Sequence, residues 1–122
     1  MRNILVVDDH PDIRRLLSVV LGKEYQIIEA ENGLEALKAI EQHRPKIVLL
    51  DVMMPGDIDG LQVLQTIKSN PHTRDTLVAM ISARGQDADS EDARIRGADA
   101  YFIKPFSPLQ VVTWVQSHLN TP

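Results

Sequence analysis

Short apolar runs alternate with longer amphipathic stretches along the whole chain. Four consecutive apolar residues at 47–50 (Ile-Val-Leu-Leu) are typical of a strand that is buried on both faces of a parallel sheet. A similar run stands near the start of the chain. These two runs and three further apolar segments predict five strands, at residues 4–7, 25–28, 47–50, 76–81 and 100–103.

Between these runs the apolar residues follow the spacing of a helix. After Pro11 they recur as one stripe of an amphipathic helix that ends near Gly22. The same reasoning predicts four further helices, which run from Gly33 to Arg44, from Gly60 to Asn70, from Ser90 to Arg96 and from Pro108 to Leu119.

This alternation of strands and helices specifies the class of fold. It is typical of a parallel sheet that is covered by helices on both faces. Five units are too few to close an eight-stranded barrel, and the 122 residues are enough for one full core. The sequence therefore predicts a single α/β domain over residues 1–122, an open, doubly wound five-stranded parallel sheet with five helices.

Polar residues follow four of the five predicted strands. They are Asp8-Asp9, Asp51, Ser82 and Lys104. The carboxyl ends of parallel strands meet at one edge of the sheet, where open α/β folds bind their ligands. If the first and third strands are neighbours, three carboxylates converge there. Carboxylates about 4 Å apart repel by several kcal/mol, so they share a proton or hold a cation. A set of oxygen ligands favours Mg²⁺.

A cation, a lysine and a hydroxyl around one carboxylate are the parts of a phosphoryl-transfer site. The chain has no Gly-rich loop with Lys-Ser/Thr that would cradle a nucleoside triphosphate. Asp51 is therefore expected to accept the phosphoryl group itself, as an acyl phosphate. The alternative, for such a residue on its own, is an aspartate that ends a strand and caps the following turn.

Composition narrows the classes of function. The net charge of −4 and the lack of a basic run argue against direct binding to nucleic acid or to an anionic membrane. The absence of cysteine excludes disulfides and thiolate chemistry. No apolar segment approaches the length of a membrane span and no signal peptide precedes the first strand, so a cytoplasmic protein is expected. The four histidines lack the spacing of metal ligands and are interpreted as surface residues.

Six motifs resemble those of the receiver domains of bacterial two-component response regulators. They occur in the order and at the approximate spacing of that family: Val6-Val7-Asp8-Asp9, Leu50-Asp51-Val52-Met53-Met54-Pro55, Asp59-Gly60, Ile81-Ser82-Ala83, Gly97-Ala98-Asp99-Ala100-Tyr101 and Lys104-Pro105-Phe106. The resemblance implies a flavodoxin-like sheet with the strand order 2-1-3-4-5. It also implies a signalling domain of a phosphorelay, not an enzyme that releases a metabolite.

The resemblance carries roles onto the matching residues. Asp51 matches the phosphoacceptor, which takes its phosphoryl group from a phosphohistidine of a sensor histidine kinase or phosphotransfer protein. Asp8 and Asp9 match the Mg²⁺-binding acids, and the backbone carbonyl of Met53 is expected as a further ligand. Lys104 matches the lysine that pairs with Asp51 and then with the phosphoryl group, and its bond to the following proline is usually cis.

The resemblance also implies a switch. Ser82 matches the residue whose hydroxyl turns toward the phosphoryl group, and Tyr101 matches an aromatic residue that moves inward with it. Phosphorylation would bias two arrangements of the surface formed by the fourth helix, fifth strand and fifth helix. This surface would bind a downstream output domain or target protein, or a second copy of the chain in a homodimer. Trp114 lies off the apolar stripe of the last helix and either contacts such a partner or packs on a neighbouring helix.

Three other functions are alternatives to this one. A pseudo-receiver, an interaction module that is not phosphorylated, typically lacks one of the acids or the lysine, whereas this chain keeps them all. A phosphatase of the haloacid-dehalogenase type needs a second Asp two residues after the nucleophile, where Met53 stands. A flavin phosphate would be repelled by the acidic first loop. One departure from the family pattern is an extra residue in the loop Gly56-Asp57-Ile58, which we expect to bulge outward and leave Asp51 in register.

Overall fold

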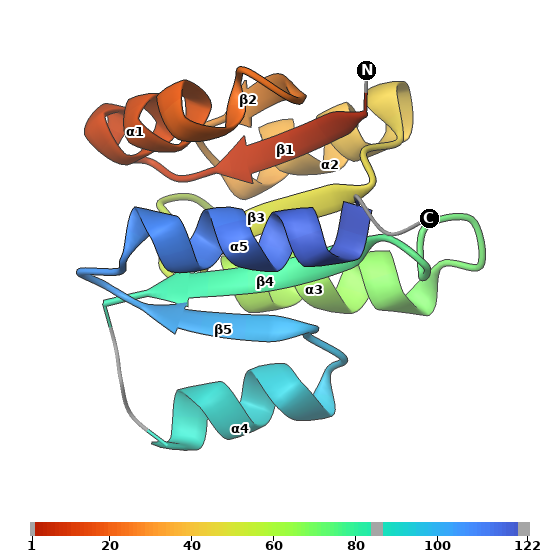
Figure 1. Ribbon diagram of the computed structural model, residues 1–122. Helices are drawn as coiled ribbons and strands as arrows, with labels where there is room; N and C mark the ends of the chain where they lie inside the picture. Colours follow the sequence, from red (N-terminus) through yellow and green to blue (C-terminus); the bar gives the residue numbers. More distant parts are fainter. Residues whose placement is uncertain (1, 84–86, 120–122) are drawn as a thin grey trace.

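Five parallel strands form one sheet with helices on both faces (Figure 1). The computed structural model describes residues 2–83 and 87–119, without the side chains of 87–89. The strands are β1 (Asn3–Val7), β2 (Gln26–Ala30), β3 (Ile47–Asp51), β4 (Leu77–Ser82) and β5 (Ala100–Ile103), and the helices are α1 (Pro11–Leu21), α2 (Gly33–His43), α3 (Gly60–Ser69), α4 (Asp87–Ile95) and α5 (Pro108–Leu119). The strand order is β2-β1-β3-β4-β5. The predicted flavodoxin-like fold is therefore confirmed.

The central strand β3 is buried along its whole length. Because side chains alternate along a strand, Val48 and Leu50 pack in one core with α2, α3 and α4, whereas Ile47 and Leu49 pack in a second core with α1 and α5. Cover on both faces explains why the run is continuously apolar. Asp51, the last residue of β3, is thus held at the carboxyl edge of the sheet by a fully packed element.

Strand β2 differs in its bounds from the prediction. It begins at Gln26 and continues to Ala30, so Tyr25 precedes it. Glu29 is exposed but pairs in register with β1. An edge strand accepts such polar residues, and they break the apolar run from which the strand was predicted.

Helix α4 begins at Asp87, whereas the apolar pattern predicted a start at Ser90. Its first turn is polar and contributes no apolar stripe. Among the described residues, no helix combines the length and the apolar character that a membrane span requires.

Helix α3 begins with a reciprocal cap between Asp59 and Gln62. The side chain of Asp59 accepts a hydrogen bond from the Gln62 backbone N–H at 2.9 Å, and the Gln62 side chain accepts one from the Asp59 backbone N–H at 2.9 Å. Together these bonds satisfy two N–H groups that the first turn would otherwise leave unpaired.

Replacing Asp59 by Ala is expected to lower the free energy of unfolding by about 1 kcal/mol, because one of these bonds is lost. Urea unfolding measures the change. Asp57→Ala, which removes an exposed acid of the preceding loop, is the control and should have little effect. Equal losses in the two variants would show that the cap contributes nothing specific.

Candidate functional site

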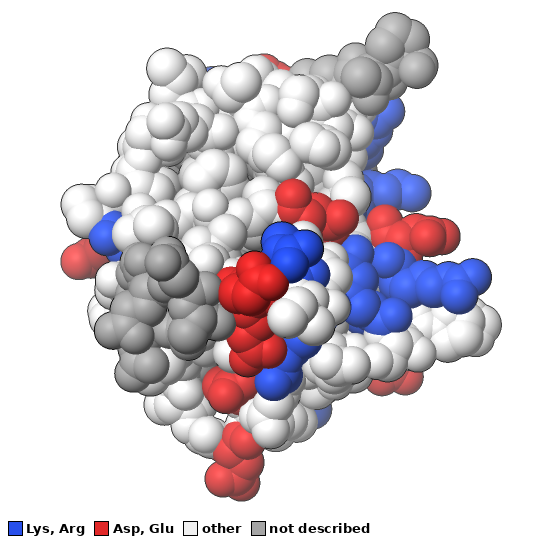
Figure 2. Space-filling model, turned by 90° about the horizontal axis from the view of Figure 1, so that it is seen from below, with Lys and Arg blue, Asp and Glu red and all other residues white. Residues whose placement is uncertain are grey.

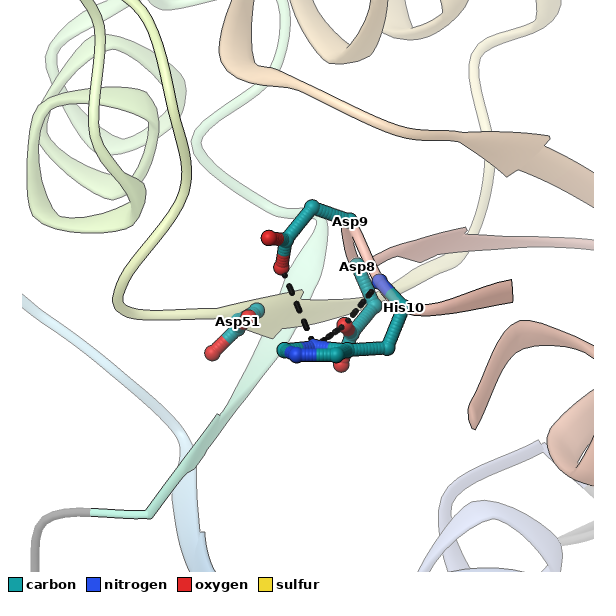
Figure 3. Close-up of side chains that lie close together, drawn as sticks. All are labelled: Asp8, Asp9, His10 and Asp51. Carbon is teal, nitrogen blue, oxygen red and sulfur yellow. Dashed lines mark hydrogen bonds and ion pairs between the residues drawn. The ribbon is translucent and has the colours of Figure 1, made fainter. Parts of the chain in front are cut away.

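Three carboxylates meet at the carboxyl edge of the sheet (Figure 3). The side chain of Asp51 at the end of β3 is 4% exposed, and that of Asp8, directly after β1, is 3% exposed. Asp9 is half-buried beside them. Together with His10, each offers one ligand atom, and these four atoms all lie within 4.8 Å of one another. The neighbouring positions of β1 and β3 in the sheet bring these acids together, as the sequence predicted.

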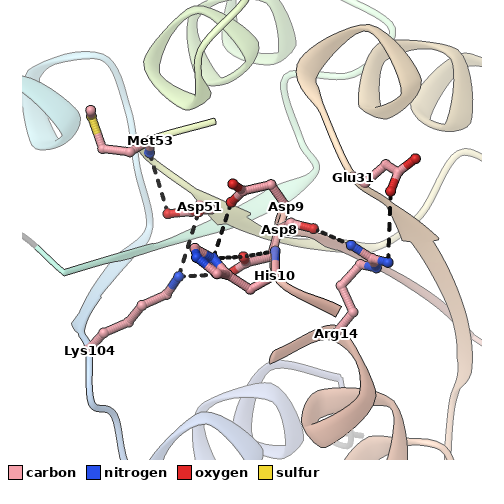
Figure 4. A network of polar contacts seen from close by, with 8 residues as sticks. All are labelled: Asp8, Asp9, His10, Arg14, Glu31, Asp51, Met53 and Lys104. Atoms are coloured by element: carbon pink, nitrogen blue, oxygen red, sulfur yellow. Dashed lines mark hydrogen bonds and ion pairs between the residues drawn. The ribbon is translucent and has the colours of Figure 1, made fainter. Parts of the chain in front are cut away.

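Lys104 reaches this cluster from the end of β5 (Figure 4). Its Nζ atom donates a hydrogen bond to Asp8 Oδ2 at 2.8 Å and lies 3.6 Å from Asp51 Oδ2. The peptide bond between Lys104 and Pro105 is cis, as the resemblance implied. Lys104 therefore contacts two of the three carboxylates, and these carboxylates outnumber the single ammonium group.

Burial and the neighbouring acids both disfavour the ionised form of Asp51. Burial, then the negative charge of Asp8, raise the pKa of Asp51 to about 6, although the positive charge of Lys104 and a hydrogen bond from the Met53 N–H act in the opposite direction. The Met53 N–H donates to Asp51 Oδ1 at 3.3 Å. The protein thus holds a carboxylate where its charged form is unfavourable, which is common where a protein binds a cation or performs chemistry.

The donor set fits a divalent cation. Asp9 Oδ1 is buried and accepts no hydrogen bond from any residue within the described ranges, and its nearest cationic candidate is His10 Nδ1, 3.2 Å away. Carboxylate oxygens are the ligands that Mg²⁺ prefers, and a cation would compensate the charge that Lys104 leaves unbalanced. The expected role of the Met53 carbonyl as a ligand remains a prediction.

Ser82 lies on β4, the neighbour of β3, and Tyr101 lies on β5, the edge strand beyond β4. Ser82 ends β4 and is completely buried, and its backbone carbonyl accepts a hydrogen bond from the Lys104 N–H at 2.7 Å. It thereby stands at the same edge of the sheet as Asp51. Tyr101 is half-buried in β5 and packs against the core on the side of α4. The switching roles predicted for both residues remain predictions.

The sequence reasoning missed the involvement of His10 in the site. Its side chain is 64% exposed, as expected for a surface histidine, but Nδ1 lies 3.0 Å from Asp8 Oδ1 and 3.2 Å from Asp9 Oδ1. The hydrogen bond to Asp8 and the charge of Asp9 raise the pKa of His10. His10 directly follows the two acids in the sequence, and this position could have indicated its involvement. The usual spacing rules for metal-binding histidines do not include such a position.

Arg14 is a second residue that the sequence reasoning did not single out. From α1, its Nη1 atom donates to the backbone carbonyl of Asp8 at 2.7 Å (Figure 4). Its Nε atom donates to Glu29 Oε1 at 3.2 Å. It therefore ties the loop that carries Asp8 to the end of β2. In the sequence, only its position one helical turn after His10 could have indicated this role.

The loop with the extra residue leaves the site intact. Gly56 adopts a φ of 100°, and Asp57 is exposed. Asp51 still pairs in register with Ile81 of β4, as expected.

Trp114 is half-buried and contacts Phe102 of β5 edge-on, with 6.3 Å between ring centroids. Its ring centroid also lies 4.7 Å from that of His118 in the same helix. It thus packs on a strand and not on a neighbouring helix, and the alternative of a partner contact remains a prediction.

Comparison with known proteins defines the class to which this fold and site belong. The family model of the response regulator receiver domain matches residues 4–116, and the chain belongs to this family. It is therefore a receiver domain of two-component signalling.

Several characterised proteins are similar to the chain. It is 43% identical over 118 residues to the transcriptional regulatory protein ResD of Bacillus subtilis, covering 96% of the chain and 48% of that protein. It is 38% identical over 117 residues to the phosphate regulon transcriptional regulatory protein PhoB of Klebsiella pneumoniae, covering 95% of the chain and 51% of that protein. The chain thus spans about half the length of these curated relatives.

Solved receiver domains share its architecture over nearly the whole chain. The receiver domain of NtrX from Brucella abortus is 34% identical, with a TM-score of 0.87 and coverage of 98% of this chain and 99% of that one. The BeF3-activated DrrB receiver domain is 28% identical, with a TM-score of 0.90 and coverage of 99% of both chains.

Proposed function

We propose that Asp51 accepts a phosphoryl group from the phosphohistidine of a sensor histidine kinase or phosphotransfer protein, in a reaction that needs Mg²⁺. The observation that carries this proposal is the buried Asp51 carboxylate, with its raised pKa, beside two further acids and one lysine. The proposal covers residues 1–122 as one phosphoacceptor domain and keeps the cytoplasmic location expected from the sequence.

The residues at the carboxyl edge divide the chemistry between them. A carboxylate oxygen of Asp51 attacks phosphorus as the bond from phosphorus to the histidine nitrogen breaks, which leaves an acyl phosphate on Asp51 and a free imidazole on the donor. Lys104, 3.6 Å from Asp51, stabilises the negative charge of the transferred group. Burial of the site limits the access of water to the reacting atoms.

Asp8, Asp9 and Asp51, with the Met53 carbonyl, would hold the Mg²⁺ ion. When bound, this ion supplies positive charge next to the phosphoryl oxygens. Lys104 keeps its hydrogen bond to Asp8 until the phosphoryl group offers it a further partner.

Phosphorylation is read out at the surface formed by α4, β5 and α5. Ser82 turns its hydroxyl toward the new phosphoryl group and Tyr101 follows, which shifts a preexisting equilibrium between two arrangements. This surface contains a broad uncharged area beside the charged side chains of α4 (Figure 2). Helix α5 has no Lys, Arg, Asp or Glu, and Leu109 and Ile103 are largely exposed there.

An uncharged surface of this kind suits a protein partner. The partner is a downstream output domain or target protein, or a second copy of the chain in a homodimer. The curated relatives are transcriptional regulators of about twice this length, which supports an output that binds DNA outside this domain. The receiver itself contacts neither nucleic acid nor membrane in this proposal. The pseudo-receiver alternative is not favoured, because all the acids and the lysine are present and close together.

Phosphoramidate, whose phosphorus–nitrogen bond resembles that of phosphohistidine, provides the test. The intact mass of the protein is expected to increase by one phosphoryl group when Mg²⁺ is present and not when it is chelated. Asp51→Asn should abolish the increase, and Asp57→Asn, which changes an exposed acid of the neighbouring loop, should preserve it. A folded wild-type protein that gains no mass would favour the pseudo-receiver.

A further inference from the structure

We infer that His10 supplies a nitrogen donor to the cation site of Asp8, Asp9 and Asp51, so that this site binds first-row transition ions such as Co²⁺, Ni²⁺ and Zn²⁺ in addition to Mg²⁺. The inference rests on the cation site of the proposed function and extends its ligand set from oxygen to nitrogen. It assigns a specific role to a residue that the family resemblance leaves without one.

The distances between the donor atoms support this assignment. His10 Nδ1 lies 3.0 Å from Asp8 Oδ1 and 3.2 Å from Asp9 Oδ1. Neighbouring ligands of a six-coordinate ion with bonds of about 2.1 Å are separated by about 3 Å. The imidazole nitrogen and the two carboxylate oxygens therefore already have the spacing of adjacent ligands, and Asp51 completes the group within 4.8 Å (Figure 3).

The backbone holds His10 in this place. Its N–H donates to Asp8 Oδ1 at 2.8 Å. Its carbonyl accepts hydrogen bonds from the N–H groups of Ile13 and Arg14, at 3.2 and 3.3 Å, at the start of α1. Arg14 in turn donates to the Asp8 carbonyl. Only the side-chain torsions of His10 remain free, and the ring they place over the acids is open to entering ions because it is 64% exposed.

The ligand preferences of metal ions determine which of them a nitrogen ligand would bind more tightly. Imidazole is a preferred ligand of Zn²⁺, Cu²⁺, Fe²⁺ and Ni²⁺, whereas Mg²⁺ prefers oxygen and keeps several waters. Asp9 Oδ1, which accepts no hydrogen bond from the described part of the chain, would be neutralised by either kind of ion. A nitrogen ligand beside it should therefore strengthen the binding of Co²⁺ much more than that of Mg²⁺.

Titration calorimetry of the tag-free chain with CoCl₂ and with MgCl₂ tests the inference. Loss of a direct ligand should cost at least as much as loss of an outer-shell partner, so His10→Gln is expected to weaken Co²⁺ binding roughly tenfold or more. Mg²⁺ binding should change by less than about twofold, because water can replace the nitrogen. The visible absorption spectrum of bound Co²⁺ should also change in His10→Gln.

Two further variants make the outcomes distinct. His72→Gln removes an exposed histidine of the loop before β4 and should leave both affinities unchanged. Asp9→Asn should weaken both ions. If Co²⁺ and Mg²⁺ bind wild type and His10→Gln alike while Asp9→Asn binds neither, His10 is no ligand and only this inference fails. If the wild type binds neither ion, the cation site of the proposed function fails as well. An equal loss in His72→Gln would mean nonspecific binding and would also overturn the inference.

Discussion

Replacing Gly60 by Ala is expected to lower the free energy of unfolding by about 3 kcal/mol or more. A Cβ atom at this position would overlap the backbone carbonyl of Asp51 and lie 2.8 Å from the Cα atom of Val52. Both obstacles are backbone, so no flexible side chain can move aside. The first turn of α3 would have to separate from the end of β3, and the Gly60 N–H would lose its hydrogen bond to the Val52 carbonyl. Urea unfolding measures the loss of stability.

Gly56→Ala provides the matched control for this effect. Gly56 has a φ of 100°, but an added Cβ would meet no atom within 4 Å. Its cost is limited to the backbone conformation, about 1–2 kcal/mol. Because Asp51 immediately adjoins the overlap at Gly60, Gly60→Ala should also slow phosphorylation, whereas Gly56→Ala should not. Equal effects of the two substitutions on stability and phosphorylation would contradict this view of the β3–α3 junction.

Asp51→Asn is expected to stabilise the metal-free protein at neutral pH. The pKa of Asp51 rises from 3.8 to about 6 on folding, and each unit corresponds to about 1.4 kcal/mol, so the gain should be about 2–3 kcal/mol. Because the folded pKa lies above the unfolded one, ionised Asp51 costs stability only above the unfolded pKa. The gain should therefore be complete above about pH 6 and disappear below about pH 4. Loss of the phosphoacceptor would thus increase stability, a trade-off known from functional sites.

Unfolding of the wild type and of Asp51→Asn, followed across this pH range in a chelator, measures the difference. Asp57→Asn is the control, since Asp57 is exposed, and it should show no such pH-dependent gain. Mg²⁺ should reduce the difference between Asp51→Asn and the wild type, because the wild type binds the ion more tightly. A gain that does not depend on pH would mean that the charge of Asp51 is not its source.

The features that could be predicted from the sequence are those that depend on local pattern and sheet geometry. The continuous apolar run before Asp51 required cover on both faces, and the structure shows that cover. The convergence of Asp8 and Asp51 followed from the rule that parallel strands end at one edge. The start of α3 at Gly60 could be predicted because the Asp59-Gly60 pair precedes an apolar stripe.

Other features depend on contacts that no local pattern reveals. The ring of His10 is directed to the acids by the turn into α1, and the reach of Arg14 to Asp8 depends on how that helix packs beside β2. Lys104 was expected to pair with Asp51, whereas its hydrogen bond to Asp8 depends on side-chain torsions that the sequence does not reveal. The polar end of β2 and the polar start of α4 have no apolar period, so their bounds could not be found from hydrophobic spacing.

The central claim is that the phosphoryl group resides on the Asp51 carboxylate. An acyl phosphate is reduced by borohydride to an alcohol, so a phosphorylated aspartate becomes homoserine. We expect peptide mass spectrometry of the phosphorylated and reduced protein to find homoserine at position 51, and none without Mg²⁺ during phosphorylation. Homoserine at Asp8, Asp9 or Asp57 with unaltered Asp51, or phosphate on a histidine or serine alone, would contradict the account.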